Sequence, residues 1–161
     1  MNADLFRHLY RYHFAENRKI WEHVASLPAG LYLQGTGYSR GSVQNQVAHL
    51  MNTDDAWFSG LRAVDLPRSY APAQADDRAP VRERWDGVEK MMQAYLANLR
   101  DEMLLDKPFR EEEDRNLVVW QVLLHVANHG TDHRAQLLRL LNDLGVKTGP
   151  QDYIFYVYEN P

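Results

Sequence analysis

The chain has 161 residues, 45% of them hydrophobic and 25% charged, and we expect a single domain over residues 1–161 with one buried core. The absence of cysteine excludes disulfides and thiolate metal sites, and a net charge of −4 without a dense Lys/Arg block argues against nucleic acid as a partner. An N-terminus without a signal-peptide pattern and the lack of any run of about 18 apolar residues predict a cytoplasmic protein with no membrane partner.

The first predicted element is an amphipathic helix over about residues 3–26, where apolar residues recur at intervals of three and four. We expect it to end at the sequence LPAG, because Pro28 and Gly30 break the helical pattern. No two histidines of this helix have the spacing of a metal site, so they are expected to pack or to lie at the surface. These histidines are His8, His13 and His23.

A second helix is predicted from Ser42, a suitable N-cap, to about Val64. His49 lies in its middle, between two apolar residues. A proline-bearing loop follows over about residues 65–80, which is long for a connection between two helices and is therefore expected to cross the fold or carry function.

The third and fourth helices are predicted over about residues 81–105 and 117–144, with Gly145 as a natural stop after the fourth. The last segment, GPQDYIFYVYENP, is aromatic and β-branched, which predicts an extended tail that covers one end of the bundle or pairs with a second subunit. Four long amphipathic helices without paired strands indicate an all-α fold, a four-helix bundle with an extended C-terminal tail.

Three histidines stand four residues apart in the fourth helix, at His125, His129 and His133. Residues four apart lie on one helix face with Cβ atoms about 5–6 Å apart, so two imidazoles can converge on one ion. All three cannot bind the same ion, because the outer two are about 12 Å apart along the helix axis. A metal site therefore needs one pair from this helix and a third ligand, for which His49 is the candidate.

The residues between the histidines distinguish the two possible pairs. His129 and His133 enclose GTD, small and polar residues that leave room for solvent and substrate, whereas His125 and His129 enclose the more apolar VAN. We favour His129 and His133, with His125 as a supporting or core histidine. Gly130 stands where the HExxH motif has its catalytic glutamate, which excludes a zinc protease. The alternative is that all these histidines are hydrogen-bonded core or interface residues.

The same segments resemble the DinB superfamily of bacterial four-helix bundles, over nearly the whole chain. YRYHFAENRKIWEHVASLP is similar to its opening helix, SVQNQVAHLMNTDDAWF to its second helix, LLHVANHGTDHRAQLLRLLNDLG to its HxxxHR(G/A)Q segment and DYIFYVYE to its tail. The resemblance implies metal ligands at His49, His129 and His133, a divalent ion such as nickel or zinc, and a homodimer. The family name refers to induction by DNA damage and implies no DNA binding.

Three imidazole ligands leave coordination positions open, as catalytic sites do. With the resemblance, this predicts a metal-dependent enzyme for a small-molecule substrate: a thiol-dependent S-transferase using a low-molecular-weight thiol, or a hydrolase acting through metal-bound water. Arg134 is the candidate anchor for an anionic substrate or the thiol cofactor, or else it forms an ion pair within the bundle. A non-catalytic metal- or small-molecule-binding bundle is the alternative function.

Three acidic residues lie close in sequence to the candidate ligands and are expected to be surface acids rather than catalytic bases: Asp54, Asp55 and Asp132. Trp57 and the tyrosines of the tail are expected to wall a pocket or to belong to the core. Because ligating imidazoles must be neutral, metal occupancy should fall as the pH drops through about 6.

Overall fold

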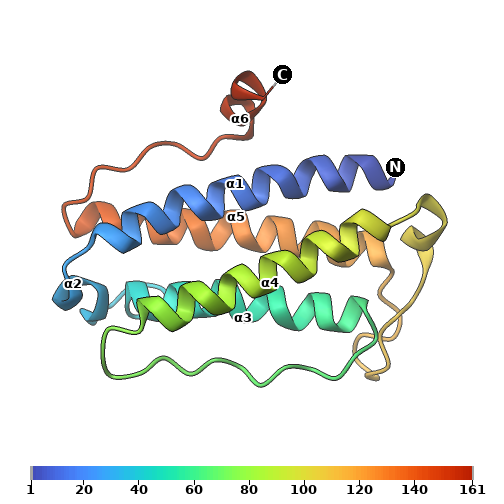
Figure 1. Cartoon of the computed structure of the whole chain (residues 1–161), viewed down its shortest axis with the longest axis horizontal. Coiled ribbons are helices and arrows are strands. Elements are labelled where there is room, and N and C mark those ends of the chain that lie inside the picture. The colour runs from blue at the N-terminus through green and yellow to red at the C-terminus, as the bar shows by residue number, and fades with distance from the viewer. Residues whose placement is uncertain (1, 161) are drawn as a thin grey trace.

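The computed structural model describes residues 2–160, and over this range it contains helices and loops but no strand. Four long helices lie side by side along the length of the molecule (Figure 1), which confirms the predicted all-α helical bundle. None of the described helices is long and apolar enough to cross a membrane. The long helices are α1 (Ala3–Ser26), α3 (Val43–Leu61), α4 (Arg78–Asn98) and α5 (Val119–Asp143). The short elements are α2 (Ala29–Leu33), the 3-10 helix η1 (Asp101–Leu105) and α6 (Tyr153–Glu159).

Each long helix packs against two others, α1 and α3 both contacting α4 and α5. The shared core consists of apolar side chains that all four contribute, among them Tyr10, Leu50, Met92 and Leu123, each at most 1% exposed. The hydroxyl of Tyr10 donates to the carbonyl of Leu123 at 2.9 Å, so this polar group is satisfied inside the core. Burying such a large side chain stabilises the fold by roughly 1.5–3 kcal/mol.

The start of α3 and the end of α5 lie at the residues that the sequence predicts. The Ser42 hydroxyl accepts from the amide of Asn45 at 3.1 Å, which confirms Ser42 as the N-cap of α3. Gly145 has φ +85° directly after α5, the left-handed conformation that favours glycine and ends a helix.

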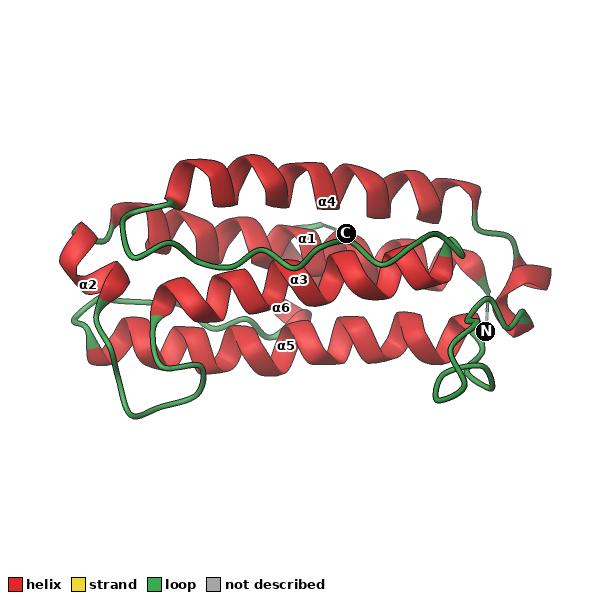
Figure 2. Cartoon of the chain, turned by 90° about the horizontal axis from the view of Figure 1, so that it is seen from below, coloured by secondary structure: helices red, strands yellow, loops and turns green. Residues whose placement is uncertain are grey.

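The long loop of residues 62–77 carries the chain back along the outside of α3, so that α4 runs parallel to α3 (Figure 1 and Figure 2). Asp77 fixes its far end: its carboxylate accepts from Gln44 at 2.9 Å, Tyr32 at 3.0 Å and Tyr70 at 2.8 Å. The predicted crossing loop is therefore an ordered connection.

The third long helix ends at Asn98, earlier than the sequence suggests. Leu99 takes an extended conformation and is fully buried, and η1 follows as a separate turn. The guanidinium of Arg7, on α1, donates to the carbonyls of Leu96 and Leu99 and so joins the end of α4 to α1.

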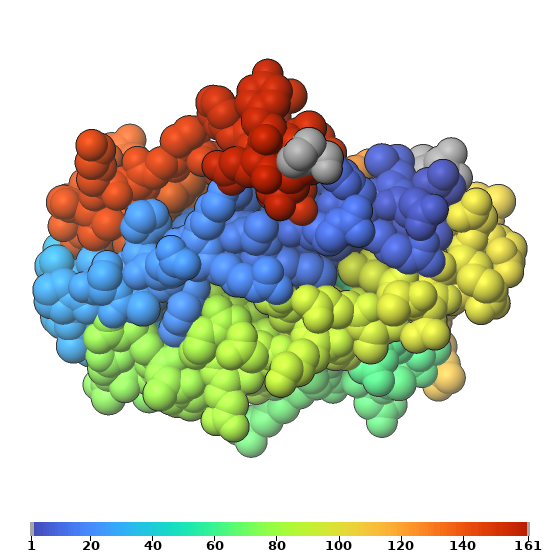
Figure 3. All heavy atoms as spheres, turned by 45° about the horizontal axis from the view of Figure 1, so that its top comes forward, coloured from blue at the N-terminus to red at the C-terminus, as the bar shows by residue number. Residues whose placement is uncertain are grey.

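The prediction of a wholly extended tail is wrong, because Tyr153–Glu159 form α6, which lies on the outer face of α1 (Figure 3). Tyr153 and Tyr156 are three residues apart and share one side of this helix. Their rings pack on Tyr12, with centroids 5.2 and 5.6 Å away, and Tyr156 is buried. Packing of aromatic rings against α1 thus outweighs the β-propensity of the segment.

A close contact at Gly130 gives a test of the packing between α1 and α5. A Cβ atom there would lie 2.4 Å from Cε1 and 2.7 Å from Nδ1 of His13, so Gly130→Ala should lower the free energy of unfolding by about 1–3 kcal/mol. Gly87 in α4 is the control, because a Cβ atom there meets nothing within 4 Å. Gly87→Ala should raise the free energy of unfolding by about 0.5–1 kcal/mol through helix propensity. Urea denaturation measures both, and a stabilising effect at Gly130 would contradict the described contact.

Candidate metal centre

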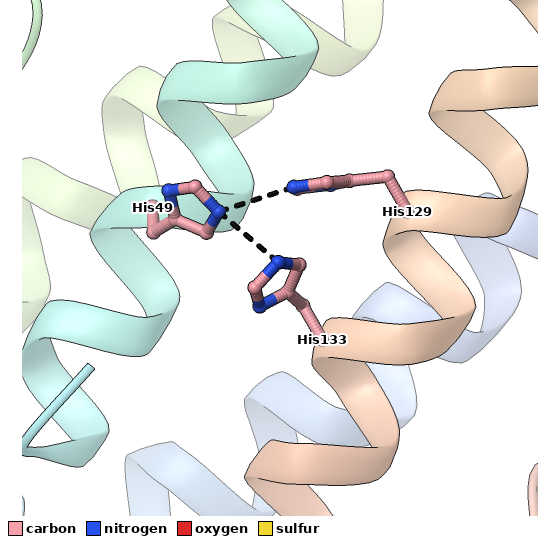
Figure 4. Close-up of side chains that lie close together, drawn as sticks. All are labelled: His49, His129 and His133. Carbon is pink, nitrogen blue, oxygen red and sulfur yellow. Dashed lines mark hydrogen bonds between the residues drawn. The ribbon is translucent and has the colours of Figure 1, made fainter. Parts of the chain in front are cut away.

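Three histidines from two helices direct their Nε2 atoms toward one another (Figure 4). His49, in the middle of α3, places Nε2 3.1 Å from Nε2 of His129 and 3.2 Å from Nε2 of His133. The last two are one turn apart on α5 and therefore share the face that packs against α3. The structure thus brings together the three histidines selected from the sequence.

The spacing of these nitrogens fits a metal ion. Tetrahedral ligands about 2.0–2.1 Å from a zinc ion lie about 3.4 Å from one another, close to the two distances from His49. One nitrogen from each ring lies within 4.8 Å of the others, and in the described part of the chain no Asp or Glu joins this group. The donor set is three imidazoles, which suits zinc or nickel.

The three rings are held neutral, the form in which histidine binds a metal. Burial lowers the pKa of His49 to about 4, helped by the charges of Arg40 and His133. Burial, followed by the other two rings, lowers the pKa of His129 to about 4. Burial also lowers the pKa of His133.

Comparison with known proteins identifies the family of the whole chain. The model of the DinB family matches residues 1–160. The chain belongs to the DinB family. Protein DinB of Bacillus subtilis (strain 168) is 26% identical to it over 164 residues, covering 97% of this chain and 95% of that protein. No solved structure matches. The family predicted from the sequence is confirmed.

In this DinB-family chain, Gln46 orients His133, a role that sequence analysis missed. Gln46 is fully buried, and its amide lies 2.8 Å from Nδ1 and 3.1 Å from the carbonyl oxygen of His133. In this structure the amide nitrogen of Gln46 donates to Nδ1. Ligation through Nε2 would put the ring proton on Nδ1, and the amide oxygen of Gln46 would accept it only after the amide turns over, which breaks its present bonds to the His133 carbonyl and to Ser39. A polar residue three positions before His49, on the same apolar helix face, was the available signal.

Two buried polar atoms have no hydrogen-bond partner: Nδ1 of His129, within the cluster, and Oδ1 of Asp54. The charge of Asp54 acts on His129 and opposes the lowering of its pKa by burial and by the other two rings. A histidine that binds metal through Nε2 carries its proton on Nδ1 and needs an acceptor, commonly a carboxylate. Asp54 is fully buried, so its prediction as a surface acid is wrong. Its Oδ1 and Nδ1 of His129 are not hydrogen-bonded to each other in this structure, so Asp54 would take this supporting role only after a shift of one of the two side chains.

Arg134 lies on the side of α5 that faces α1, within a buried polar network. Its guanidinium donates to Asn17 at 2.9 Å and to Gln151 at 3.0 Å, and it lies 3.2 Å from Nδ1 of His13. Nε2 of the fully buried His13 is in turn 3.4 Å from Asp54. Arg134 therefore forms its hydrogen bonds inside the bundle, with neutral groups. The sequence predicts that it either anchors an anion or forms an ion pair within the bundle, and it forms no such ion pair with the described residues.

The other candidate side chains lie around the histidines without joining them. His125 is exposed, which excludes the core role, one of the two predicted for it. Its ring centroid lies 5.0 Å from Trp57 and 5.9 Å from His129, beside a cavity of about 200 Å³ that both His125 and Trp57 line. Asp55 forms an ion pair with Arg84 at 3.2 Å, and the exposed Asp132 accepts from Gln136 at 3.0 Å.

The lowered pKa values predict that the metal-free protein loses stability as the pH falls from about 6.5 to about 4. Between these pH values, histidines of the unfolded chain bind protons, whereas His49 and His129 of the folded protein stay neutral. The free energy of unfolding therefore rises with pH and levels off above about 6.5. Urea midpoints across this range should fall less steeply with acidification in His49→Ala than in the wild type. Equal slopes would contradict the depressed pKa. Metal occupancy should fall as the pH approaches about 4, where the folded His49 and His129 take up protons, and so below the pH of about 6 suggested by the sequence.

Proposed function

We propose that this protein binds one divalent transition-metal ion, zinc or nickel, through His49, His129 and His133 and uses it in catalysis on a small molecule. The observation that carries this proposal is the convergence of three Nε2 atoms without a fourth protein ligand among the described residues. Closed structural zinc sites have four protein ligands, whereas catalytic sites keep a position open for substrate.

The ion would supply Lewis-acid chemistry, polarising a substrate oxygen or lowering the pKa of a bound thiol. The surrounding side chains would set its position: Gln46 fixes the ring of His133, and Asp54 is suited to accept the Nδ1 proton of His129. The cavity beside Trp57 and His125 would take an apolar part of the substrate.

Of the two reactions expected from the sequence, we favour thiol-dependent S-transfer over hydrolysis. A hydrolase needs a carboxylate base near the attacking water. Asp55 is paired with Arg84, Asp132 bonds Gln136, and Asp54 is buried. A basic side chain, that of Arg40, contacts His49 instead, and a cation suits the carboxylates of a thiol cofactor. A non-catalytic metal- or small-molecule-binding bundle remains the alternative, distinguished by thiol turnover.

We further propose that the chain forms a homodimer. The support is a set of exposed apolar side chains on α1, α5 and α6, which a partner subunit would remove from water. They are Leu5, Leu124, Ile154, Phe155 and Tyr158.

Elemental analysis of protein purified without added metal or an affinity tag tests the metal site. We expect about one transition-metal ion per chain in the wild type and a loss of bound metal in His49→Ala and His133→Ala, because each removes one of three ligands. His125→Ala is the matched control: it removes an exposed histidine one turn away and should keep the metal.

Metal bound equally by all four proteins, or by none after reconstitution, would overturn the proposed site. If the ion is present, the loaded protein should consume a low-molecular-weight thiol with an electrophilic substrate, and His133→Ala should not. Metal without turnover of either a thiol or a hydrolysable ester would favour the non-catalytic alternative.

The proposed support from Asp54 gives a second prediction. Asp54→Asn should weaken metal binding by about 10- to 100-fold, because it replaces the carboxylate that would accept from Nδ1 of His129. Asp55→Asn is the control, since its side chain pairs with Arg84 instead. Competition with a chelator measures the affinity, and urea denaturation checks the fold. Equal affinities in the two folded variants would show that Asp54 does not support the ligand.

A further inference from the structure

A positively charged side chain lies against the three-histidine cluster. Nη2 of Arg40 is 3.0 Å from Nε2 of His49, the atom that also faces His129 and His133. Arg40 is exposed, in the loop that precedes α3, and in the described part of the chain it forms no ion pair with a carboxylate. The guanidinium is thus free of an acidic partner at the place where the metal would bind.

The loop that carries Arg40 is anchored to the start of α3, in part through Gln46, which contacts His133. The carbonyl of Arg40 accepts from Asn45 at 3.1 Å, and the amide of Thr36 donates to the carbonyl of Gly41 at 2.5 Å. The hydroxyl of Ser39 donates to Gln46 at 2.9 Å, and Gln46 contacts His133. The backbone of the loop is therefore fixed relative to the cluster, while the long side chain of Arg40 can move.

A divalent ion bound to the three histidines would carry a positive charge that the described residues do not compensate. Three neutral imidazoles leave the double charge of the ion uncompensated, and Arg40 adds a further positive charge beside it. The ion and the guanidinium also compete for the lone pair of His49, so the guanidinium must move away from that nitrogen. An anion that contacts both cations would remove the repulsion.

We propose that the substrate carries an oxyanion, a carboxylate or a phosphate-like group, held between the metal ion and Arg40 at a coordination position that the thiol leaves open. The planar guanidinium presents paired donors that match two oxygens of such a group. The inference rests on the proposed metal site and narrows its substrate class: a neutral ester or amide would leave the charge of Arg40 unmatched.

Cobalt(II)-loaded protein tests this assignment, because the visible absorption of the ion reports on its ligands. The probes are acetate and methylphosphonate, with acetamide as the neutral counterpart of acetate. The variants are Arg40→Gln and Arg40→Lys. Arg62→Gln is the control for net charge, because Arg62 is exposed at the opposite end of α3.

We expect acetate or methylphosphonate to change the spectrum of the wild type at concentrations where acetamide does not. Arg40→Gln should weaken oxyanion binding by about tenfold or more, the effect of losing a charge-assisted hydrogen bond. Arg40→Lys should bind with intermediate affinity, because it keeps the charge and loses the paired donors, and Arg62→Gln should match the wild type.

Equal oxyanion affinity in the wild type and Arg40→Gln, or equal response to acetate and acetamide, would overturn the proposal while leaving the metal site intact. Failure of the wild type to bind cobalt would show in the spectrum before any anion is added. That result would overturn the metal site and the oxyanion proposal together. A response to only one of the two anions would support the proposal and identify the oxyanion as a carboxylate or a phosphate-like group.

Discussion

The close approach of three imidazoles between α3 and α5 is the constraint on which the rest of this structure depends. Two helices that share a hydrophobic core place His49 within hydrogen-bond distance of both His129 and His133, in surroundings that disfavour protonation. Each neutral ring carries a single N–H proton, so three Nε2 atoms that face one another cannot all find hydrogen-bond partners among themselves. Such an arrangement costs folding free energy, and a bound cation is the simplest group that would offset it.

α5 organises two different polar regions because its successive residues face different helices. His129 and His133 face α3, whereas Gly130 and Arg134 face α1, and the missing side chain at Gly130 lets the ring of His13 come close. Asp54 belongs to both regions, since it contacts His13 and acts electrostatically on His129. The buried polar network toward α1 thus stands directly behind the histidine cluster.

The sequence predicts the parts of this arrangement that have a helical period. Four amphipathic stretches predict the bundle, and the four-residue spacing of His129 and His133 predicts that both rings share one face of α5. The burial of Asp54 and His13 could not be predicted in this way, because it depends on which faces of α1, α3 and α5 meet. The sequence pattern also misplaced the tail, whose aromatic residues pack as a helix on α1, and it left open the place of His125, which lies on α5 but points to solvent.

The attachment of the tail has a consequence for local opening. The side chain of Gln151 is hydrogen-bonded to Arg134 and to the carbonyl of Thr131, and its own carbonyl accepts from the hydroxyl of Tyr12. These hydrogen bonds join positions up to 139 residues apart in the chain. Contacts of this range form after α1 and α5 have come together, and most of α6 itself is exposed. Detachment of the tail would therefore require little unfolding elsewhere. It would admit water to the guanidinium of Arg134, so hydration of the buried network can fluctuate while the helices remain folded.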